Sequence, residues 1–278
     1  MADRQNIKLR FWRFAAVIGN SLAAIISEKR CGICAAPIRR PNPNLKLGLC
    51  RKCLDAMPRR KAGYCLRCGE FVSADEMPYG LCGNCLLSPP PWQKIYFHGA
   101  YQGLLRESIS RLKFGQVLHL AEALGGLLAA HPELAVPSPP PTTTGDSSPI
   151  NNFAPRPDDA PYSCIIPVPL HKKRLTERGF NQSALLAAPL ARTLSLPLEL
   201  KLLSRSRDTA HQTGLSREVR RHNMLEAFTV TGRADGLRIL LFDDVLTTGA
   251  TLASAAACLL RAGAERVDVA VLARTPLG

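Results

Sequence analysis

From residue 162 onward, apolar runs alternate with stretches whose apolar residues recur at helical spacing. Short apolar runs are typical of buried strands, whereas recurrence every three or four residues indicates helices. The pattern predicts strands at 162–168, 238–242 and 266–273, and helices at 183–194 and 252–262. Pro189 is expected to kink the first helix, and Gly263 suits the C-terminus of the second. This alternation favours an α/β fold, a parallel sheet with helices on both faces.

The chain from 92 to 161 begins in the same way and then changes. Residues 94–101 are rich in aromatic side chains and predict a strand, and 104–114 and 118–130 predict helices. Residues 137–161 contain eight prolines and three consecutive threonines. We expect this segment to be a flexible, partly extended linker or a surface insertion.

Four Cys-x-x-Cys pairs dominate residues 31–85, and three consecutive prolines close the segment at residues 89–91. Two such turns present four sulfurs to one tetrahedral ion, so the pairs predict two structural zinc ribbons. Sequential pairing is the simplest arrangement, and a crossed one is the alternative. Redox chemistry is disfavoured by four repeated pairs outside a thioredoxin-like context. The predicted ligands are Cys31, Cys34, Cys50, Cys53, Cys65, Cys68, Cys82 and Cys85.

Cys164 and Cys258 lie in apolar surroundings and are expected in the core. Residues 1–30 begin with basic side chains and contain a modest apolar stretch, 14–26, that Gly19, Asn20 and Ser21 interrupt. This stretch is too short and too polar to span a bilayer, and it predicts an amphipathic helix, not a signal peptide. The expected location is cytoplasmic, where paired cysteines are metal ligands more often than disulfides.

These boundaries divide the chain into three parts. We expect an amphipathic helix at 1–30, a double zinc ribbon at 31–91, and an α/β domain at 92–278 with a proline-rich insertion at 137–161.

The chain is strongly basic, with 36 lysines and arginines against 22 acids and a formal charge of +14. Two sites that each bind Zn²⁺ through four thiolates would lower this charge to about +10. Residues 1–61 hold 14 basic and 3 acidic side chains, and residues 162–221 hold 11 and 4. Such regions indicate anionic partners, either phosphates in a pocket or a nucleic-acid backbone. A solvated basic surface explains the first region equally well.

The most specific segment is 238–251, in which an apolar strand ends in Asp243 and Asp244 and turns through Thr247, Thr248, Gly249, Ala250 and Thr251 into a helix. Backbone amides at a helix N-terminus bind anions, and threonine hydroxyls add donors. Carboxylates at the carboxyl end of a strand can accept hydrogen bonds from ribose hydroxyls. The ordinary alternative is a strand-to-helix turn capped by Asp and Thr. The segment resembles the phosphoribosyl pyrophosphate motif of type I phosphoribosyltransferases.

Two further basic segments complete the candidate site. Residues 165–182 run from a strand through a basic loop into a helix, and four cations between 172 and 178, among them Arg174 and Arg178, suit a pyrophosphate. Residues 203–223 include Arg205 and Arg207 and are polar and basic. This last segment suits a lid that closes over the ligand, and an exposed helix and loop is the equal alternative.

These three elements, in this order after the paired cysteines, resemble the ComF family of bacterial competence phosphoribosyltransferase-like proteins. The strings that carry the resemblance are Pro-Val-Pro-Leu-His with Arg-Gly-Phe-Asn-Gln, Arg-x-Thr-x-x-Gln with Leu-Ser, and Asp-Asp-Val-Leu-Thr-Thr-Gly-Ala-Thr. Together they extend over nearly the whole chain from Cys31 to Pro276. The proline-rich segment 137–161 is longer than the family's usual connection.

The resemblance implies that Asp243 and Asp244 take the ribose hydroxyls of phosphoribosyl pyrophosphate and that 247–251 take its 5-phosphate. It places Arg174, Arg178, Arg205 and Arg207 on the pyrophosphate side, with Mg²⁺ neutralising that group. The reaction would displace pyrophosphate from the anomeric carbon. No segment reads as a hood for a particular base, so the acceptor stays open.

Three functions fit these patterns. One is an enzyme that transfers a phosphoribosyl group, including one of nucleotide metabolism. Another is a competence factor that uses the site as a sensor while basic surfaces contact single-stranded DNA and competence-machinery proteins. The resemblance implies a role in DNA uptake during natural transformation. Aromatic stacking platforms for single strands are sparse in the ribbons, which offer Tyr64, Phe71 and Tyr79. The third is a purely structural zinc adaptor.

Overall fold

The computed structural model of the chain describes residues 30–38, 48–73, 80–115, 117–131, 133–134, 161–206 and 227–276. The helix predicted at 1–30 lies outside these residues apart from Arg30, and the proline-rich segment 137–161 lies outside them apart from Pro161. In the part of the chain that is described, no helix has both the length and the apolar character needed to cross a bilayer.

A four-stranded parallel sheet forms the centre of the protein, with strand order β1-β6-β5-β2. Its strands are β1 (Ile95–Ala100), β2 (Cys164–Pro167), β5 (Arg238–Leu246) and β6 (Arg266–Arg274). The helices are α2 (Arg51–Asp55), α3 (Gly83–Leu87), α4 (Gly103–Phe114), α5 (Leu120–Ala129), α6 (Lys172–Arg178), α7 (Gln182–Leu194) and α9 (Ala250–Arg261). The predicted α/β class is confirmed.

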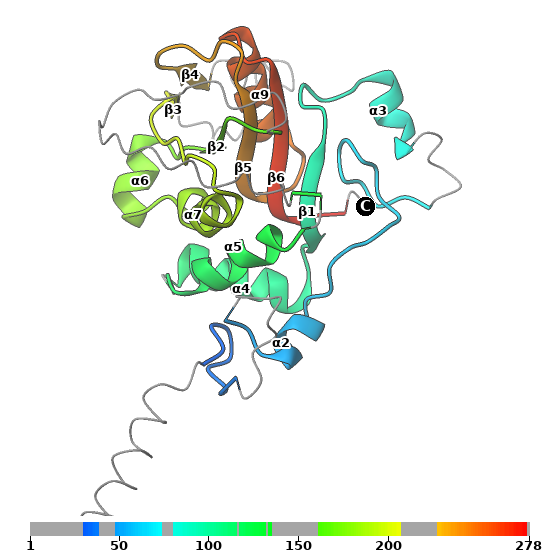
Figure 1. Ribbon diagram of the computed structural model, residues 1–278, viewed down its shortest axis with the longest axis vertical. Helices are drawn as coiled ribbons and strands as arrows, with labels where there is room; N and C mark the ends of the chain where they lie inside the picture. The colour runs from blue at the N-terminus through cyan, green and yellow to red at the C-terminus, as the bar shows by residue number, and fades with distance from the viewer. Residues whose placement is uncertain are drawn as a thin grey trace, which may run out of the picture.

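Helices cover both faces of this sheet (Figure 1). Along β5, Leu240 and Phe242 enter one core cluster with α5 and α7, whereas Ile239 and Leu241 enter the other with α9. A strand buried on both sides needs apolar residues at successive positions, which is why β5 at 239–242 and β6 at 269–273 are continuous apolar runs and do not alternate. Cys164 and Cys258 are both buried in the second cluster, as predicted.

Two elements differ from the sequence prediction. The basic segment that we expected as a loop is a helix, α6, which His171 caps at its start and Gly179 ends in the left-handed conformation at φ 79°. Its lysines, arginines and glutamate are good helix formers. With caps at both ends, the segment forms a helix although it has no apolar face to bury. Strand β5 continues to Leu246, four residues beyond the predicted end, because it pairs with β6 up to Arg274.

A second, antiparallel sheet joins β3 (Leu203–Arg205) to β4 (Phe228–Val230) and packs beside α9. Most of the predicted lid, including Arg207, lies outside the described residues.

The cysteine pairs form two ribbons, which attach to the α/β core at different places (Figure 1). We call the described residues of 30–57 the first ribbon and those of 64–87 the second ribbon. The first packs into the core cluster of α4 and α5, where Cys31, Ile33 and Cys53 are buried. The second lies along β1, where the amide of Ile95 donates to the carbonyl of Leu66 at 3.2 Å. The ribbon thereby lies against the edge of the parallel sheet that β1 forms.

Candidate functional site

Asp243 and Asp244 lie in β5 just beyond the point where its neighbour β2 ends. The last pair of that ladder joins Pro167 to Phe242, so the acids have β6 on one side and no β2 residue opposite them on the other. Both acids thus lie at the carboxyl ends of the parallel strands, the edge at which ligands bind in open α/β sheets. The position of both carboxylates is therefore set by unequal strand lengths.

The start of α7 holds a hydroxyl against Asp243. Asn181 caps this helix, because its side chain accepts from the amide of Ser183 at 3.0 Å and donates to the carbonyl of Val168 at 3.1 Å. These bonds fasten the helix to the end of β2 and place the Ser183 hydroxyl 2.7 Å from the Asp243 carboxylate, to which it donates. The Asn-Gln-Ser string thus acts by capping a helix and positioning a donor.

Lys113 near the C-terminus of α4 supplies a cation to the second acid. Its Nζ lies 3.0 Å from Oδ2 of Asp244, which is 4% exposed. A buried carboxylate requires such a partner, because removing a charge from water is costly. A ligand cation or hydroxyl that approaches Asp244 therefore meets a carboxylate already bound to an amine.

Asp243 holds a proton more tightly than an ordinary aspartate does. Burial, followed by the charge of Asp244, raises the pKa of Asp243 from 3.8 to about 7. The hydroxyl of Ser183, the amide of Asp244 and the charge of Lys113 act in the opposite direction. Two carboxylates placed this close cannot both ionise freely, which is a common property of functional sites.

Residues 247–251 form the turn from β5 into α9. Gly249 caps the helix at φ 80°, a left-handed conformation that favours glycine. A Cβ at this position would lie 3.2 Å from Cη2 of Trp92 and 3.3 Å from a methyl group of Leu246, so the space is closed as well. Thr247 and Thr248 are exposed, and Thr251 lies in the first turn of α9. The turn places threonine hydroxyls and the amides of a twelve-residue helix directly after the acid pair.

The predicted cations are spread over two elements. Arg178 ends α6, where it donates to Oε1 of Gln182 at 2.6 Å and lies over the ring of Phe114 at 5.7 Å. This contact places it near the end of α4, which also carries Lys113. Arg174 is in α6, and Arg205 is in β3, with its guanidinium over the ring of Phe228 at 5.5 Å. Their assignment to a pyrophosphate stays a prediction.

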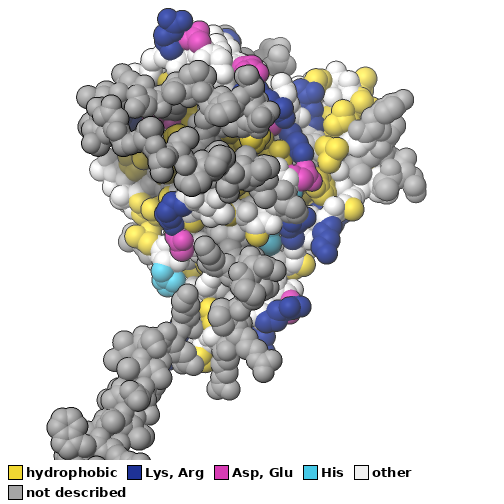
Figure 2. All heavy atoms as spheres, in the orientation of Figure 1, with side chains coloured by type: hydrophobic (Ala, Val, Ile, Leu, Met, Phe, Trp, Pro, Cys, Tyr) yellow, Lys and Arg dark blue, Asp and Glu magenta, His cyan; other side chains and the backbone are white. Residues whose placement is uncertain are grey.

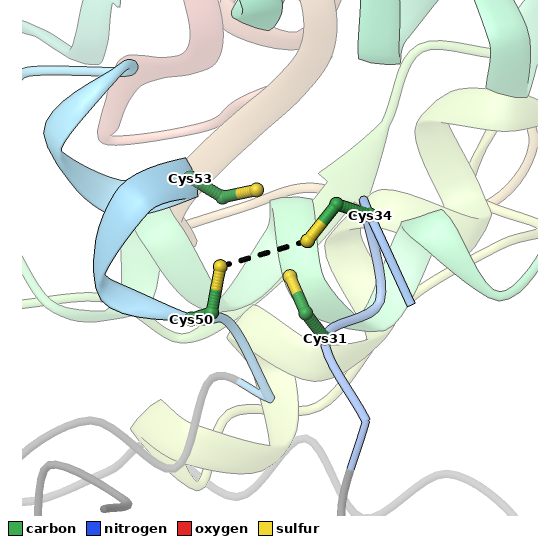
Figure 3. Close-up of side chains that lie close together, drawn as sticks. All are labelled: Cys31, Cys34, Cys50 and Cys53. Carbon is green, nitrogen blue, oxygen red and sulfur yellow. Dashed lines mark hydrogen bonds between the residues drawn. The ribbon is translucent and has the colours of Figure 1, made fainter. Parts of the chain in front are cut away.

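The eight paired cysteines form two clusters, and each joins sequential pairs. In each cluster the four sulfurs lie within 4.8 Å of one another. Figure 3 shows the thiols of the first cluster pointing toward one another, two from the start of α2 and two from the preceding turn. The sulfurs of Cys34 and Cys50 are 3.6 Å apart, and those of Cys68 and Cys82 are 3.7 Å apart. Tetrahedral Zn²⁺ with Zn–S bonds near 2.3 Å requires about 3.8 Å, so the donor sets fit zinc.

The two ribbons repeat one hydrogen-bonding pattern. The amide of Cys31 donates to Ala36 as that of Cys65 donates to Glu70, each at 2.8 Å. Burial raises the thiol pKa in both turns, but backbone hydrogen bonds outweigh it and lower the pKa of Cys31 to about 6 and of Cys65 to about 7. Each turn therefore stabilises one thiolate, the form that binds a metal.

The sequence has relatives along most of its length. Residues 181–277 match the phosphoribosyl transferase domain family. The DNA utilization protein YhgH of Salmonella typhi is 36% identical over 245 residues, which are 88% of this chain and 96% of that protein. Competence protein F of Haemophilus influenzae is 34% identical over 234 residues, 82% of this chain and 91% of that protein. The chain belongs to the ComF family. Competence protein ComFC of Bacillus subtilis is 40% identical over 99 residues, 36% of this ComF chain and 39% of that protein.

Family membership confirms the resemblance inferred from the motifs, and the matched domain extends from the cap of α7 through β6. Within this ComF chain, two contributors to the acid pair were missed by the sequence prediction. Ser183 follows the Asn-Gln motif directly, so a helix cap in that motif was a signal for it. Lys113 lies in an amphipathic helix without any local motif.

Proposed function

We propose that the chain binds phosphoribosyl pyrophosphate, or a related ribose 5-phosphate, at the carboxyl end of β5, beside the starts of α7 and α9. The observation that carries this proposal is the acid pair beyond the end of β2, followed at once by the turn into α9. Carboxylates accept from vicinal hydroxyls, and helix amides with threonine hydroxyls bind a phosphate. A ribose 5-phosphate carries both groups within the reach of these elements.

In this arrangement Asp243 and Asp244 accept from the ribose hydroxyls, and 247–251 bind the 5-phosphate. Arg174 and Arg178 on α6 bind the pyrophosphate, together with Arg205 on β3 and Arg207. Ser183 orients the carboxylate of Asp243, to which it already donates. Lys113 holds the Asp244 carboxylate in place through its ion pair.

Magnesium would enter with the ligand. Outside the cysteine clusters, the described residues contain no group of three metal-binding side chains close together. Mg²⁺ is commonly bound by one or two carboxylates together with substrate phosphates. The acid pair and the pyrophosphate oxygens together offer such a set. Zinc in both cysteine clusters would have a structural role, because each cluster has four thiol ligands and no open position.

The proposed chemistry is displacement of pyrophosphate from the anomeric carbon, in which the protein mainly positions charge. The proposed biological role is DNA uptake during natural transformation, in line with the names of the competence relatives. A competence factor that senses the ligand without turning it over is the second candidate, favoured by the basic excess of residues 162–221.

Thermal unfolding tests the binding proposal. Phosphoribosyl pyrophosphate with Mg²⁺, at one hundred times its dissociation constant, should stabilise the protein by about 2.7 kcal/mol. The effect should disappear in the double variant Asp243→Asn with Asp244→Asn, and it should persist in Glu265→Gln, an exposed acid at the opposite end of the sheet. Equal stabilisation of the wild type and the double variant would place the ligand elsewhere.

Two assays then separate the candidates. Release of pyrophosphate in the presence of an acceptor supports the enzyme. Affinity for single-stranded DNA that falls steeply with salt and survives the two Asp changes supports the binding role.

A further inference from the structure

Arg274, the last residue of β6, binds the backbone of the turn that follows β5. Its side chain is 3% exposed. Nη1 donates to the carbonyl of Thr247 at 2.6 Å and to that of Leu246 at 3.3 Å. In a planar trans peptide the carbonyl and the following amide point in opposite directions. The guanidinium therefore turns the amides of Thr247 and Thr248 away from itself.

The same guanidinium binds the second ribbon. Nε donates to the carbonyl of Cys68 at 3.1 Å, and Nη2 donates to Oε2 of Glu70 at 2.7 Å. The Glu70 carboxylate is itself largely buried, with 15% of its side chain exposed. Cys68 belongs to the cysteine cluster of this ribbon. One buried cation thus joins a candidate metal ligand to the candidate phosphate turn.

Trp92 makes a second connection between the same two regions. Its ring nitrogen donates to the carbonyl of Arg67 at 2.6 Å, and Nε of Arg67 donates to the carbonyl of Trp92 at 3.1 Å. The far edge of the indole closes the space at Gly249. A rearrangement of the second ribbon would therefore move both the ring behind Gly249 and the cation beneath Thr247.

The first ribbon lacks a comparable link among the described residues. Nε2 of the buried His98 in β1 lies 2.7 Å from the carbonyl oxygen of Met57, and Nη1 of Arg111 donates to the carbonyl of Ile33 at the long distance of 3.5 Å. Neither bond involves the 247–251 turn, and the ribbon is otherwise attached through buried apolar side chains such as Cys31 and Cys53. Apolar packing tolerates small shifts, whereas a shared, buried guanidinium fixes directions at both of its ends.

We propose that Arg274 is a positioning residue for the ligand and that it links binding at the 247–251 turn to the order of the second ribbon. This inference rests on the proposed function, because it takes phosphate binding at that turn as given. A ligand that orders the turn should also reduce opening of the second ribbon. By reciprocity, loss of the contact between Arg274 and the ribbon should weaken ligand binding by the factor by which the ligand reduces that opening.

Hydrogen exchange resolved by peptide tests this on the full, zinc-loaded chain, with and without phosphoribosyl pyrophosphate and Mg²⁺. In the wild type we expect slower exchange in peptides covering 246–252 and also in those covering 64–72. Peptides covering 30–36 of the first ribbon should not change. If Arg274 had a merely structural role, exchange in the second ribbon would be the same with and without ligand. Slower exchange on addition of ligand therefore indicates a positioning role.

Variants at Glu70 break the link while they leave the turn intact. Glu70→Ala should retain protection of the turn, lose protection of the second ribbon, and weaken ligand binding about fivefold or more. Glu70→Gln keeps an acceptor for Nη2 and should fall between wild type and Ala. Asp55→Ala, which removes an exposed ion pair with Arg51 in the first ribbon, should stay within twofold of wild type.

The outcomes separate the two proposals. Protection of the turn without protection of the second ribbon, or unchanged affinity in Glu70→Ala, would overturn the link and leave the proposed function standing. No protection of the turn in the wild type would overturn the proposed function itself and the ligand-dependent link with it.

Discussion

The two cysteine ribbons have the same local structure and different attachments. Each contains two Cys-x-x-Cys turns, and the first cysteine of each makes the same backbone bond five residues ahead. The first ribbon inserts into the core cluster of α4 and α5, whereas the second lies along β1 and binds Arg274 and Trp92. One ribbon therefore completes a hydrophobic core, and the other contacts the 247–251 turn through Arg274 and Trp92.

The surfaces of the ribbons differ in a related way. In Figure 2, hydrophobic side chains gather around α3 of the second ribbon, where Leu66, Leu86 and Leu87 are exposed. In the first ribbon the exposed pair Arg51 and Asp55 is charged. The two ribbons share their Cys-x-x-Cys turns and backbone bonds. Their different surfaces and attachments therefore arise from the side chains between and around the cysteines.

Removing one cysteine from each ribbon should give the largest effect. Cys34→Ser and Cys68→Ser occupy matching positions, and each should lower the zinc content from two ions per chain to one. Loss of a structural metal costs more than about 4 kcal/mol of unfolding free energy, and the loss should be larger for Cys34→Ser because its ribbon is part of the main core. Metal analysis and urea unfolding measure both. Equal destabilisation would refute the difference in attachment.

The arginines that bind each ribbon give the next comparison. Arg274→Met leaves the Glu70 carboxylate without its buried partner and should cost about 3 kcal/mol. Arg111→Met removes one long hydrogen bond and should cost about 0.5 kcal/mol. Unfolding by urea at neutral pH provides the values. A loss for Arg111→Met as large as that for Arg274→Met would show that the first ribbon depends on its arginine as strongly as the second does.

A pH series isolates the acid pair from both ribbons. The pKa of Asp243 is raised from 3.8 to about 7, so the folded state holds its proton more tightly than the unfolded state. Stability from this group is present below the unfolded pKa and is lost as pH rises toward 7. Asp243→Asn cannot ionise, so its stability relative to wild type should increase by about 2 kcal/mol between pH 5.5 and 7.5.

Ser183→Ala provides the control for this measurement. It removes the hydroxyl that favours the charged form, so the pH-dependent loss should shift to higher pH while the group remains titratable. A difference between Asp243→Asn and wild type that does not vary with pH would contradict the raised pKa.

The smallest effect concerns the residue that follows the first Cys-x-x-Cys pair of each ribbon. Ala35 has φ 57° in the first ribbon, and Gly69 occupies the matching place at φ 70°. Ala35→Gly should therefore stabilise the protein by about 1 kcal/mol, because the left-handed conformation is unfavourable for a residue with a Cβ. Gly69→Ala should destabilise it by more, since its Cβ would lie 3.3 Å from the ring of Phe97. Thermal unfolding of both variants measures these changes, and a destabilised Ala35→Gly or a stabilised Gly69→Ala would contradict the prediction.

Local motifs explain what the sequence predicted. The acid pair, the threonine turn and the sequential cysteine pairs each lie within a short segment, and their chemistry depends on neighbouring residues. The β-α alternation likewise followed from apolar runs buried on both faces. Helix α6 was missed because Leu175 is its single large apolar residue, so the segment has no hydrophobic period even though its caps and propensities favour a helix.

Tertiary contacts explain what was missed. Ser183 lies 60 residues from Asp243 along the chain, and Glu70 lies 204 residues from Arg274. Lys113 and Arg274 are cations in ordinary amphipathic or apolar elements, and only the packed sheet brings them to the acids and to the turn. No periodicity or spacing records such a pairing, because it depends on which strands become neighbours.

Calorimetric titration of the zinc-loaded chain with phosphoribosyl pyrophosphate and Mg²⁺ tests the central claim most directly. The account predicts saturable binding of one ligand per chain and none to the variant with Asp243→Asn and Asp244→Asn. The absence of binding to a folded, zinc-loaded wild type, or the same affinity in the double variant, would contradict it.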